Sequence, residues 1–238
     1  MKLLAIDTAS GCCSAALWID GAVREAAQCT ARDHARLVLP MVQGLLQEAG
    51  IGLPQLSAIA FGRGPGSFTG LRIAAGVVQG LAFGAGLGVV PVSDLRALAA
   101  QALRRADPAP AASRVLACMD ARMSEVYAAV YAVEGGMPGN ELLTERVTTA
   151  GQLTDDCRVA GGAVMRAAGR GLAAWPQIAV KLAVPAAGCF ADAEPQARDI
   201  ADIAVRELAR GLQPAPPEAA QPVYLRDRVA AVPSGTVL

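Results

Sequence analysis

The sequence predicts an α/β protein built as two lobes. Short apolar strands alternate with longer apolar helices over the first hundred residues, which is typical of a sheet flanked by helices. A proline-rich linker, Asp107-Pro108-Ala109-Pro110, follows. Beyond it, a strand and hairpin with the layout of the first begin again. We therefore expect an N-terminal lobe over residues 1–106 and a C-terminal lobe over residues 107–238.

The first lobe is predicted to open with three strands. Residues 2–7 form a buried strand, and residues 13–19 and 22–29 form a hairpin about the turn Asp20-Gly21. The pattern then predicts a helix over 33–49 ending at Gly50, a strand over 57–62, a helix over 67–83, a strand over 89–92 and a helix over 93–105.

The second half repeats this opening. Residues 116–120 echo the strand that ends at Asp7, and residues 126–131 with the turn Gly135-Gly136 echo the hairpin. We further expect a strand over 157–160 running through Gly161-Gly162 into a short helix, and an amphipathic helix over 194–210. Residues 211–222 form a proline-rich connection, whereas residues 140–150 and 175–192 favour no element.

Composition restricts the classes of function. Lysine plus arginine equals aspartate plus glutamate at 21 each, so no overall basic field is available to hold nucleic acid, and any such contact is local or made by a partner. The apolar start of the chain meets Asp7 too soon for a signal peptide. Residues 73–92 carry no charge and are long enough to span a membrane, but their five glycines, Gln79 and Pro91 favour a buried helix, a turn and a strand. We expect a cytoplasmic protein with no membrane contact.

Six cysteines, with no C-x-x-C pair, are interpreted as buried free thiols of a reducing compartment. Cys12 and Cys13 are neighbours on a strand and point to opposite faces, which suits neither a mutual disulfide nor a shared metal. The others are Cys29, Cys118, Cys157 and Cys189.

Five motifs follow one another along the chain. They are Leu4-Ala5-Ile6-Asp7-Thr8; Asp33-His34 with Leu39-Pro40-Met41-Val42; Gly62-Arg63-Gly64-Pro65-Gly66-Ser67-Phe68-Thr69-Gly70; Asp120-Ala121-Arg122 with Glu125-Val126-Tyr127; and Pro222-Val223-Tyr224-Leu225-Arg226. Together they closely resemble the bacterial TsaB family of tRNA threonylcarbamoyladenosine biosynthesis proteins, within the superfamily of actin-like ATPases and sugar kinases. The resemblance implies a duplicated actin-like (ribonuclease H-like) fold, in which each lobe has a mixed sheet flanked by helices.

The same resemblance implies that the chain is a non-catalytic partner subunit. Members of this family pair with a homologous catalytic TsaD-like subunit and with a small TsaE-like ATPase in the cytoplasm. The assembly moves a threonylcarbamoyl group from its adenylate to the adenosine beside the anticodon, in tRNAs reading codons that begin with A. Contact with tRNA is expected through the complex, and self-association is expected when the partner is absent.

Candidate catalytic and metal-binding residues are few. The TsaD-like subunit holds a metal with two histidines spaced H-x-x-x-H after a Pro-Val strand, and the matching positions here are Asp94 and Leu98. Leucine binds no metal, and His34 is the one histidine of the sequence, so a two-histidine centre is excluded. We interpret His34, with Asp33 as helix N-cap, as structural or interfacial; a general base is the alternative, but no nucleophile is visible. No catalytic residue and no metal site are predicted.

The nucleotide-binding elements of the superfamily are incomplete. Residues 7–11 depart from its first phosphate loop, D-x-G-[TS], and residues 120–123 lack the glycines of the second, although Gly161-Gly162-Ala163 resembles its adenosine turn. The loop 64–67 is either an anion nest or, as we prefer, a tight turn into a helix. Asp120 and Glu125 beside Arg122 indicate a salt-bridged cluster rather than an acid–base pair.

We therefore predict no bound cofactor. A small-molecule kinase or ATPase of the superfamily is the alternative function, and the incomplete phosphate loops argue against it. A peptidase-like hydrolase is disfavoured by the single histidine and by the lack of any nucleophile–base arrangement.

The helices over 33–49 and 67–83 are the predicted partner interface. Both are more apolar than burial of one face requires. Gly76 and Gly80, four residues apart, cost about 1 kcal/mol each relative to alanine, which the close approach of another helix would offset. In the resembled family the TsaD-like partner docks here. The interface residues predicted are Leu37, Val38, Met41, Val42, Leu45, Leu71, Ala74, Gly76, Val78 and Gly80.

Overall fold

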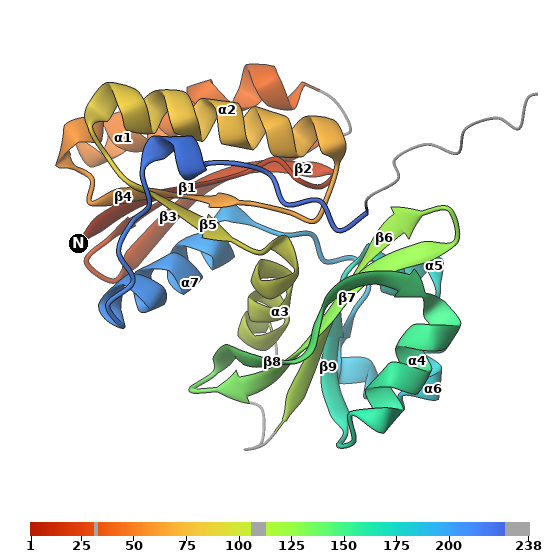
Figure 1. The fold of residues 1–238 in the computed structure, drawn as a ribbon. Coiled ribbons are helices and arrows are strands. Elements are labelled where there is room, and N and C mark those ends of the chain that lie inside the picture. Colours follow the sequence, from red (N-terminus) through yellow and green to blue (C-terminus); the bar gives the residue numbers. More distant parts are fainter. Residues whose placement is uncertain (31–32, 106–112, 227–238) are drawn as a thin grey trace, which may run out of the picture.

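Two five-stranded sheets, one in each lobe, form the framework of the computed structural model, which describes residues 1–30, 33–105 and 113–226 (Figure 1). Their strand orders are β3-β2-β1-β4-β5 and β10-β9-β6-β7-β8. In each sheet the central strand pairs antiparallel with the next strand of the chain and parallel with a later one. The duplicated α/β fold expected from the sequence is confirmed.

The first sheet lies between two helices on one side and one on the other (Figure 1). Its strands are β1 (Lys2–Asp7), β2 (Cys12–Ile19), β3 (Ala22–Cys29), β4 (Ala58–Gly62) and β5 (Val89–Val92). The helices α1 (His34–Ala49) and α2 (Phe68–Ala85) cover Leu4, Ile6 and Phe61, whereas α7 (Ala197–Ala209) covers Leu3 and Ala5. Alternate residues of β1 therefore face two separate cores, which is why residues 3–6 of this strand are all apolar.

The second sheet is flanked by shorter helices. Its strands are β6 (Arg114–Arg122), β7 (Glu125–Glu134), β8 (Met137–Thr149), β9 (Val164–Ala168) and β10 (Cys189–Phe190). Helices α4 (Ala150–Val159), α5 (Arg170–Ala174) and α6 (Gln177–Lys181) bury Leu116, Val130 and Leu153 against it. Helix α3 (Asp94–Arg105) lies between the lobes and contacts β6, β8, β9 and α7.

Two expectations for the second half are wrong. Residues 157–160 are the end of α4 rather than a strand, because Thr149 caps that helix by accepting from the Gln152 amide and Leu153 and Cys157 share its buried face. The segment after Gly161-Gly162 is strand β9, not a helix. Residues 140–150, for which no element was expected, contain most of the long edge strand β8. The helix predicted from residue 194 begins at Ala197.

The division at residue 106/107 stays a proposal, since the linker 107–110 lies outside the described residues. It needs one amendment: α7 belongs to the second part of the sequence but packs on the first sheet, where Ile200 and Ile203 contact the β1 side chains. The chain thus returns to the first lobe at its end. Residues 211–222 continue along that lobe, where Ala215 pairs with Val89.

One pair of cysteines differs from expectation. Cys12 on β2 and Cys29 on β3 form a disulfide, so the interpretation of all six as free thiols is wrong for these two. They face each other at the last register pair of the hairpin, with a Cα–Cα distance of 3.9 Å. Cys13, Cys118 and Cys157 are buried free thiols, as expected, and Cys189 is a half-buried one.

Helix α2 is the one described helix that is long and apolar enough to cross a membrane by length and composition. One face of it packs on the first sheet through Leu71, Ala74 and Val78, none more than 1% exposed. It ends at Gly86, whose φ of 66° turns the chain into β5. The interpretation of residues 73–92 as a helix, a turn and a strand is confirmed.

Candidate functional site

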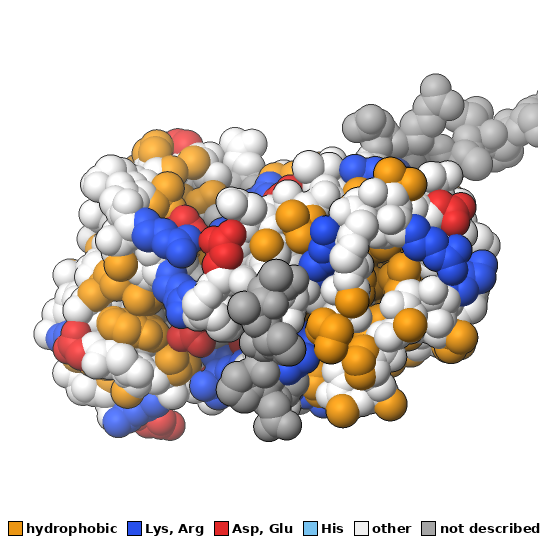
Figure 2. Space-filling view, turned by 90° about the horizontal axis from the view of Figure 1, so that it is seen from below, with side chains coloured by type: hydrophobic (Ala, Val, Ile, Leu, Met, Phe, Trp, Pro, Cys, Tyr) orange, Lys and Arg blue, Asp and Glu red, His pale blue; other side chains and the backbone are white. Residues whose placement is uncertain are grey.

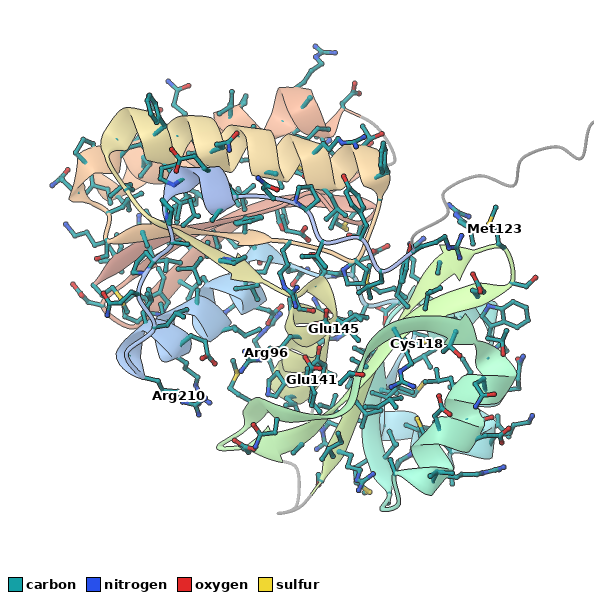
Figure 3. The ribbon with its side chains drawn as sticks, viewed as in Figure 1. Arg96, Cys118, Met123, Glu141, Glu145 and Arg210 are labelled. Atoms are coloured by element: carbon teal, nitrogen blue, oxygen red, sulfur yellow. A yellow bond between two sulfur atoms is a disulfide. The ribbon has the colours of Figure 1, made fainter. Side chains whose placement is uncertain are left out.

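A cleft of about 890 Å³ lies between the two lobes. Its walls come from the loop after β1 (residues 9–11), the loop into α2 (65–68), the β6–β7 hairpin (120–123), residues 191–195, and residues 223–226. We call this the interlobe cleft. Met123, exposed at the tip of the β6–β7 hairpin, marks its outer end (Figure 3).

The turn after β1 bonds to its own lobe. The Ala9 amide donates to Asp7 Oδ1 at 2.8 Å, and the Ala9 carbonyl accepts from the Ser67 amide at 2.7 Å. Thr8 Oγ1 donates to the Gly70 carbonyl at 2.6 Å. The Ala9 and Ser67 amides are therefore already committed to this fold, and neither points at the cleft as a free donor for phosphate.

The glycines of the loop 64–70 serve close packing of that turn. A Cβ on Gly66 would collide with Ala9, and one on Gly70 with the Thr8 carbonyl. Gly64 has a φ of 113°, and Ser67 caps α2 by accepting from the Gly70 amide. The preferred interpretation, a tight strand-to-helix turn, is confirmed.

Asp7 and Asp94 form a fully buried pair of carboxyls at the ends of β1 and β5. Asp94 Oδ2 accepts from the Gly64 amide at 2.5 Å. Burial raises the pKa of Asp7 to about 6, against the hydrogen bonds from the Ala9 amide and Asp94. Burial, and then the charge of Asp7, raise the pKa of Asp94 well above its ordinary value. Among the described residues, Asp7 Oδ2 and Asp94 Oδ1 have no hydrogen-bond partner, and the raised pKa values favour a pair that carries at least one proton.

His34 lies at the start of α1, where its ring contacts the main chain. Its Nε2 lies 2.9 Å from the Thr30 carbonyl, and the side chain is half-buried at the first residue of α1. Asp33 occupies the N-cap position with a φ of 76°, but its side chain makes no capping hydrogen bond, so that part of the expectation is wrong. Instead the Asp33 carbonyl accepts from the Arg36 and Leu37 amides.

The acidic residues of the β6–β7 hairpin are ion-paired, as predicted, but each pairs with a different arginine. Asp120 lies 3.6 Å from Arg122, whereas Glu125 pairs with Arg226 from the other end of the chain. This second pair ties residues 223–226 to the hairpin. The fourth and fifth motifs of the sequence therefore meet at one wall of the cleft, which the spacing of the motifs alone did not show.

The lobes are also joined beside α3. Arg63, after β4, forms an ion pair at 3.2 Å with Glu145 of β8, and Tyr131 donates its hydroxyl hydrogen bond to the same carboxylate at 3.3 Å. Arg96 of α3 reaches Glu207 of α7 at 2.8 Å. Figure 3 shows Arg96 and Glu145 in this region between the sheets. These contacts link the elements on either side of α3.

The predicted interface residues divide into two groups. Six of them pack inside their own lobe and are at most 4% exposed, so they cannot contact a partner; this corrects the prediction. They are Val38, Val42, Leu45, Leu71, Ala74 and Val78. Leu37 and Met41 are half-buried, and Gly76 and Gly80 are exposed. The helical period turns the first group toward the sheet and leaves the second group outside.

The outer face of α2 carries three exposed glycines four residues apart: Gly76, Gly80 and Gly84. We call them the glycine stripe. A Cβ at any of the three would meet nothing within 4 Å, so the chain's own packing does not require glycine there. Phe83 beside the stripe is 75% exposed. At the other end of the helix, Arg72 stacks 3.5 Å over the exposed ring of Phe68.

The opposite face of the molecule has a different character. Figure 2 shows basic and acidic side chains interspersed there with apolar ones, with no broad field of one sign. Among the described residues, no group of three or more histidine, cysteine, aspartate or glutamate side chains is placed to hold a metal. Leu98, at the position of the second metal histidine of TsaD-like proteins, is fully buried in the core beneath the second sheet.

Comparison with known proteins gives consistent results. The family model for TsaD, tRNA N6-adenosine threonylcarbamoyltransferase, matches residues 26–231. The tRNA threonylcarbamoyladenosine biosynthesis protein TsaB of Escherichia coli is 41% identical over 97% of this chain and 96% of its own length. A tRNA N6-adenosine threonylcarbamoyltransferase of Chromobacterium violaceum is 40% identical over 33% of this chain and 23% of its own. A crystal structure from Pseudomonas aeruginosa, described as similar to peptidase YEAZ, matches with a TM-score of 0.82 and 40% identity, over 94% of this chain and 99% of that one.

Proposed function

Since the chain belongs to the TsaB family of tRNA threonylcarbamoyladenosine biosynthesis proteins, we propose that it is the accessory subunit of a tRNA threonylcarbamoyltransferase. A TsaD-like partner carries out the transfer of the threonylcarbamoyl group to the adenosine beside the anticodon, in tRNAs reading codons that begin with A. This chain pairs with that partner and makes it competent, without supplying a catalytic residue.

The observation that carries this proposal is the glycine stripe of α2. Glycine inside a helix costs about 1 kcal/mol relative to alanine, and Gly76, Gly80 and Gly84 bear that cost with no packing contact in return. A row of missing side chains lets a second helix approach closely, so that backbone and flanking apolar groups make contact. Phe83 lies beside this row, where it can be buried by the same helix.

The identity of the partner follows from homology. This chain resembles both TsaB proteins and, over a shorter stretch, a threonylcarbamoyltransferase. Two homologous folds each present helices equivalent to α1 and α2, and such faces can pair about a pseudo-twofold axis. The same geometry gives self-association of this chain when the partner is absent.

The interior of the chain supports an accessory role rather than that of a kinase or ATPase. The amides after β1 are bonded within the lobe, and burial raises the pKa values of Asp7 and Asp94, which disfavours the ionised carboxylates that phosphate chemistry with a metal needs. We place the protein in the cytoplasm, with the TsaE-like ATPase and tRNA bound through the complex and no membrane attachment.

Reconstitution tests this proposal. Purified TsaD-like and TsaE-like proteins are given threonylcarbamoyl-adenylate and tRNA, with or without this chain, and modified adenosine is measured. We expect product only when the chain is present, and none with Gly80→Arg, which puts a charged side chain into the stripe. Gly151→Arg, at an exposed helical position on α4 where a Cβ would meet only Thr149 Oγ1 at 4.0 Å, is the matched control and should retain activity.

Circular dichroism must show that both variants are folded. Val78→Glu is unsuitable as a test, because Val78 is fully buried and a charge there would unfold the lobe. Full activity without the chain, or a folded Gly80→Arg protein that supports normal modification, would refute the proposal.

A further inference from the structure

The disulfide between Cys12 and Cys29 is accessible from one side only. Cys29, the last residue of β3, is exposed, whereas Cys12 on β2 is 2% exposed. Of the two residues, Cys29 is therefore the one open to an external reagent in the folded chain. Nothing in the accessory function described above uses this bond.

We propose that Cys12–Cys29 is a thiol–disulfide exchange site, at which a low-molecular-weight thiol of the glutathione class attaches to Cys29. The thiolate of the small molecule attacks Cys29 Sγ and forms a mixed disulfide. The Cys12–Cys29 bond breaks, and Cys12 leaves as a thiolate that takes up a proton. A second small thiol then attacks the small-molecule sulfur, which releases Cys29 as a thiol and the small molecule as its own disulfide.

The neighbouring thiols do not compete for this exchange. Cys13 is fully buried beside Cys12, and burial, followed by the charge of Asp7, raises its pKa to about 11. A thiol that stays protonated and shielded from water neither attacks a disulfide nor reacts with an external one. Cys118 and Cys157 are buried in the second lobe. Cys189, on β10 of the other sheet, is half-buried, and burial raises its pKa. Among the cysteines of the first lobe, the exchange is therefore confined to one pair.

The bond lies close in sequence to the start of α1. Cys29 is followed by Thr30, whose carbonyl lies 2.9 Å from Nε2 of His34, the first residue of α1. On the other side, the Cys12 amide donates to Ser10 Oγ at 3.3 Å, in the loop that lines the cleft. Opening the bond leaves the rest of the β2–β3 register paired, so the hairpin persists. Cys29 and its neighbour Thr30, whose carbonyl contacts His34, lose their covalent link to β2.

Opening the disulfide also affects binding of the TsaD-like partner, a consequence that rests on the proposed function. Helix α1 packs beside α2, which carries the glycine stripe. Loosening the first turn of α1 changes the border of that surface. We expect the oxidised chain to bind the partner a few-fold more tightly than the reduced one.

Mass spectrometry of the full chain in glutathione redox buffers tests the exchange without any partner. After equilibration, the chain is alkylated in denaturant, so that every free thiol is accessible: we expect Cys12 and Cys29 to resist alkylation after oxidising buffer, and both to be alkylated after reducing buffer. Cys12→Ser should accumulate one glutathione on Cys29, because no resolving thiol remains, and Cys29→Ser should gain none on Cys12. Cys13→Ser is the control and should exchange like the natural chain.

Two results would overturn the proposal: alkylation of both cysteines after equilibration in oxidising buffer, or an adduct on Cys12 instead of Cys29. Amide hydrogen–deuterium exchange at residues 34–38 should accelerate when the disulfide is reduced. An unchanged rate of hydrogen–deuterium exchange there would contradict the proposed effect on α1. If thiol–disulfide exchange proceeds as expected but the oxidised and reduced chains bind the partner with equal affinity, only the proposed effect on partner binding is refuted. A chain that exchanges as expected but binds no partner would count against the proposed function instead.

Discussion

Replacing Asp94 by asparagine should stabilise the protein at alkaline pH. In the natural chain, Asp94 Oδ2 accepts from the Gly64 amide, and burial together with the charge of Asp7 favours the protonated form of Asp94. Asparagine keeps the acceptor for Gly64 and presents an amide hydrogen to Asp7. Asp7 can then ionise beside a permanent donor, instead of beside a second carboxyl that must stay protonated.

The magnitude follows from the pKa of Asp7, which burial raises from 3.8 to about 6. A raised folded-state pKa means that the native protein holds this proton more tightly than the unfolded chain does. The contribution of the protonated Asp7 carboxyl to the free energy of unfolding is therefore fully present below pH 3.8 and is lost as the pH rises through about 6. The free energy of unfolding falls further when Asp94 loses its proton. A rise of about 2 in pKa, at about 1.4 kcal/mol per unit, corresponds to about 3 kcal/mol.

Asp94→Asn should recover about 1–3 kcal/mol of this at pH 8, or about 3–8 °C in the unfolding midpoint for a chain of this size. Thermal unfolding followed by circular dichroism at pH 4, 6 and 8 measures the gain, which should shrink toward pH 4. Asp94→Ala is the control: it leaves the buried Gly64 amide without its acceptor and should cost about 1–3 kcal/mol at every pH. A folded Asp94→Asn protein that is less stable than the natural chain at pH 8, or equally stabilised at pH 4 and 8, would refute the reasoning.

Three further outcomes are expected. His34→Ala should leave single-turnover transfer by the saturated complex unchanged, since His34 Nε2 contacts a main-chain carbonyl; a loss of several orders of magnitude with intact assembly would reveal a catalytic role. Glu145→Gln removes the charge that pairs with Arg63 between the lobes, and calorimetry should show a free energy of unfolding about 1 kcal/mol lower. An unchanged free energy of unfolding would mean that the ion pair does not contribute to stability. Elemental analysis should find no stoichiometric zinc or iron in the purified chain; one firmly held metal would contradict the argument from its single histidine.

The first lobe follows from the sequence because its signals are local. Strand β5 begins and ends at the predicted residues, and α1 stops at Gly50 as expected, since short apolar runs there are bounded by glycine or by helix caps. Strand β8 lacks such signals. It is a half-exposed edge strand with several register shifts against β7, so apolar and polar residues do not alternate along it.

The disulfide could have been predicted from a signal that the sequence does contain. The turn Asp20-Gly21 fixes the hairpin register at Ile19 opposite Ala22, and counting outward along both strands brings Cys12 opposite Cys29. Comparison of Cys12 with its sequence neighbour alone missed this pairing.

The orientation of the interface helices and the carboxyl pair depended on tertiary packing. Helix α2 is apolar on nearly every side, so periodicity did not show which residues face the sheet, and Val78 was placed on the wrong side. Asp7 and Asp94 each follow a buried strand of one sheet, which is the signal for their meeting. That both would be fully buried depends on Gly62 of β4, because a Cβ there would collide with the two carboxyls.

The central claim is that the glycine stripe exists for the partner and not for the fold. The triple variant Gly76→Ala, Gly80→Ala, Gly84→Ala adds three methyl groups that meet nothing within 4 Å in the isolated chain. Because alanine favours the helix, the isolated chain should become more stable by up to about 3 kcal/mol. The same methyl groups should hold a partner helix away.

Titration calorimetry with the TsaD-like partner measures this directly. We predict that the dissociation constant of the triple variant is at least tenfold higher, which corresponds to a loss of about 1.4 kcal/mol or more of binding free energy. Its unfolding temperature should be higher than that of the natural chain. Gly151→Ala on α4 is the matched control and should leave the affinity unchanged. A stabilised triple variant that binds the partner as tightly as the natural chain would contradict the account.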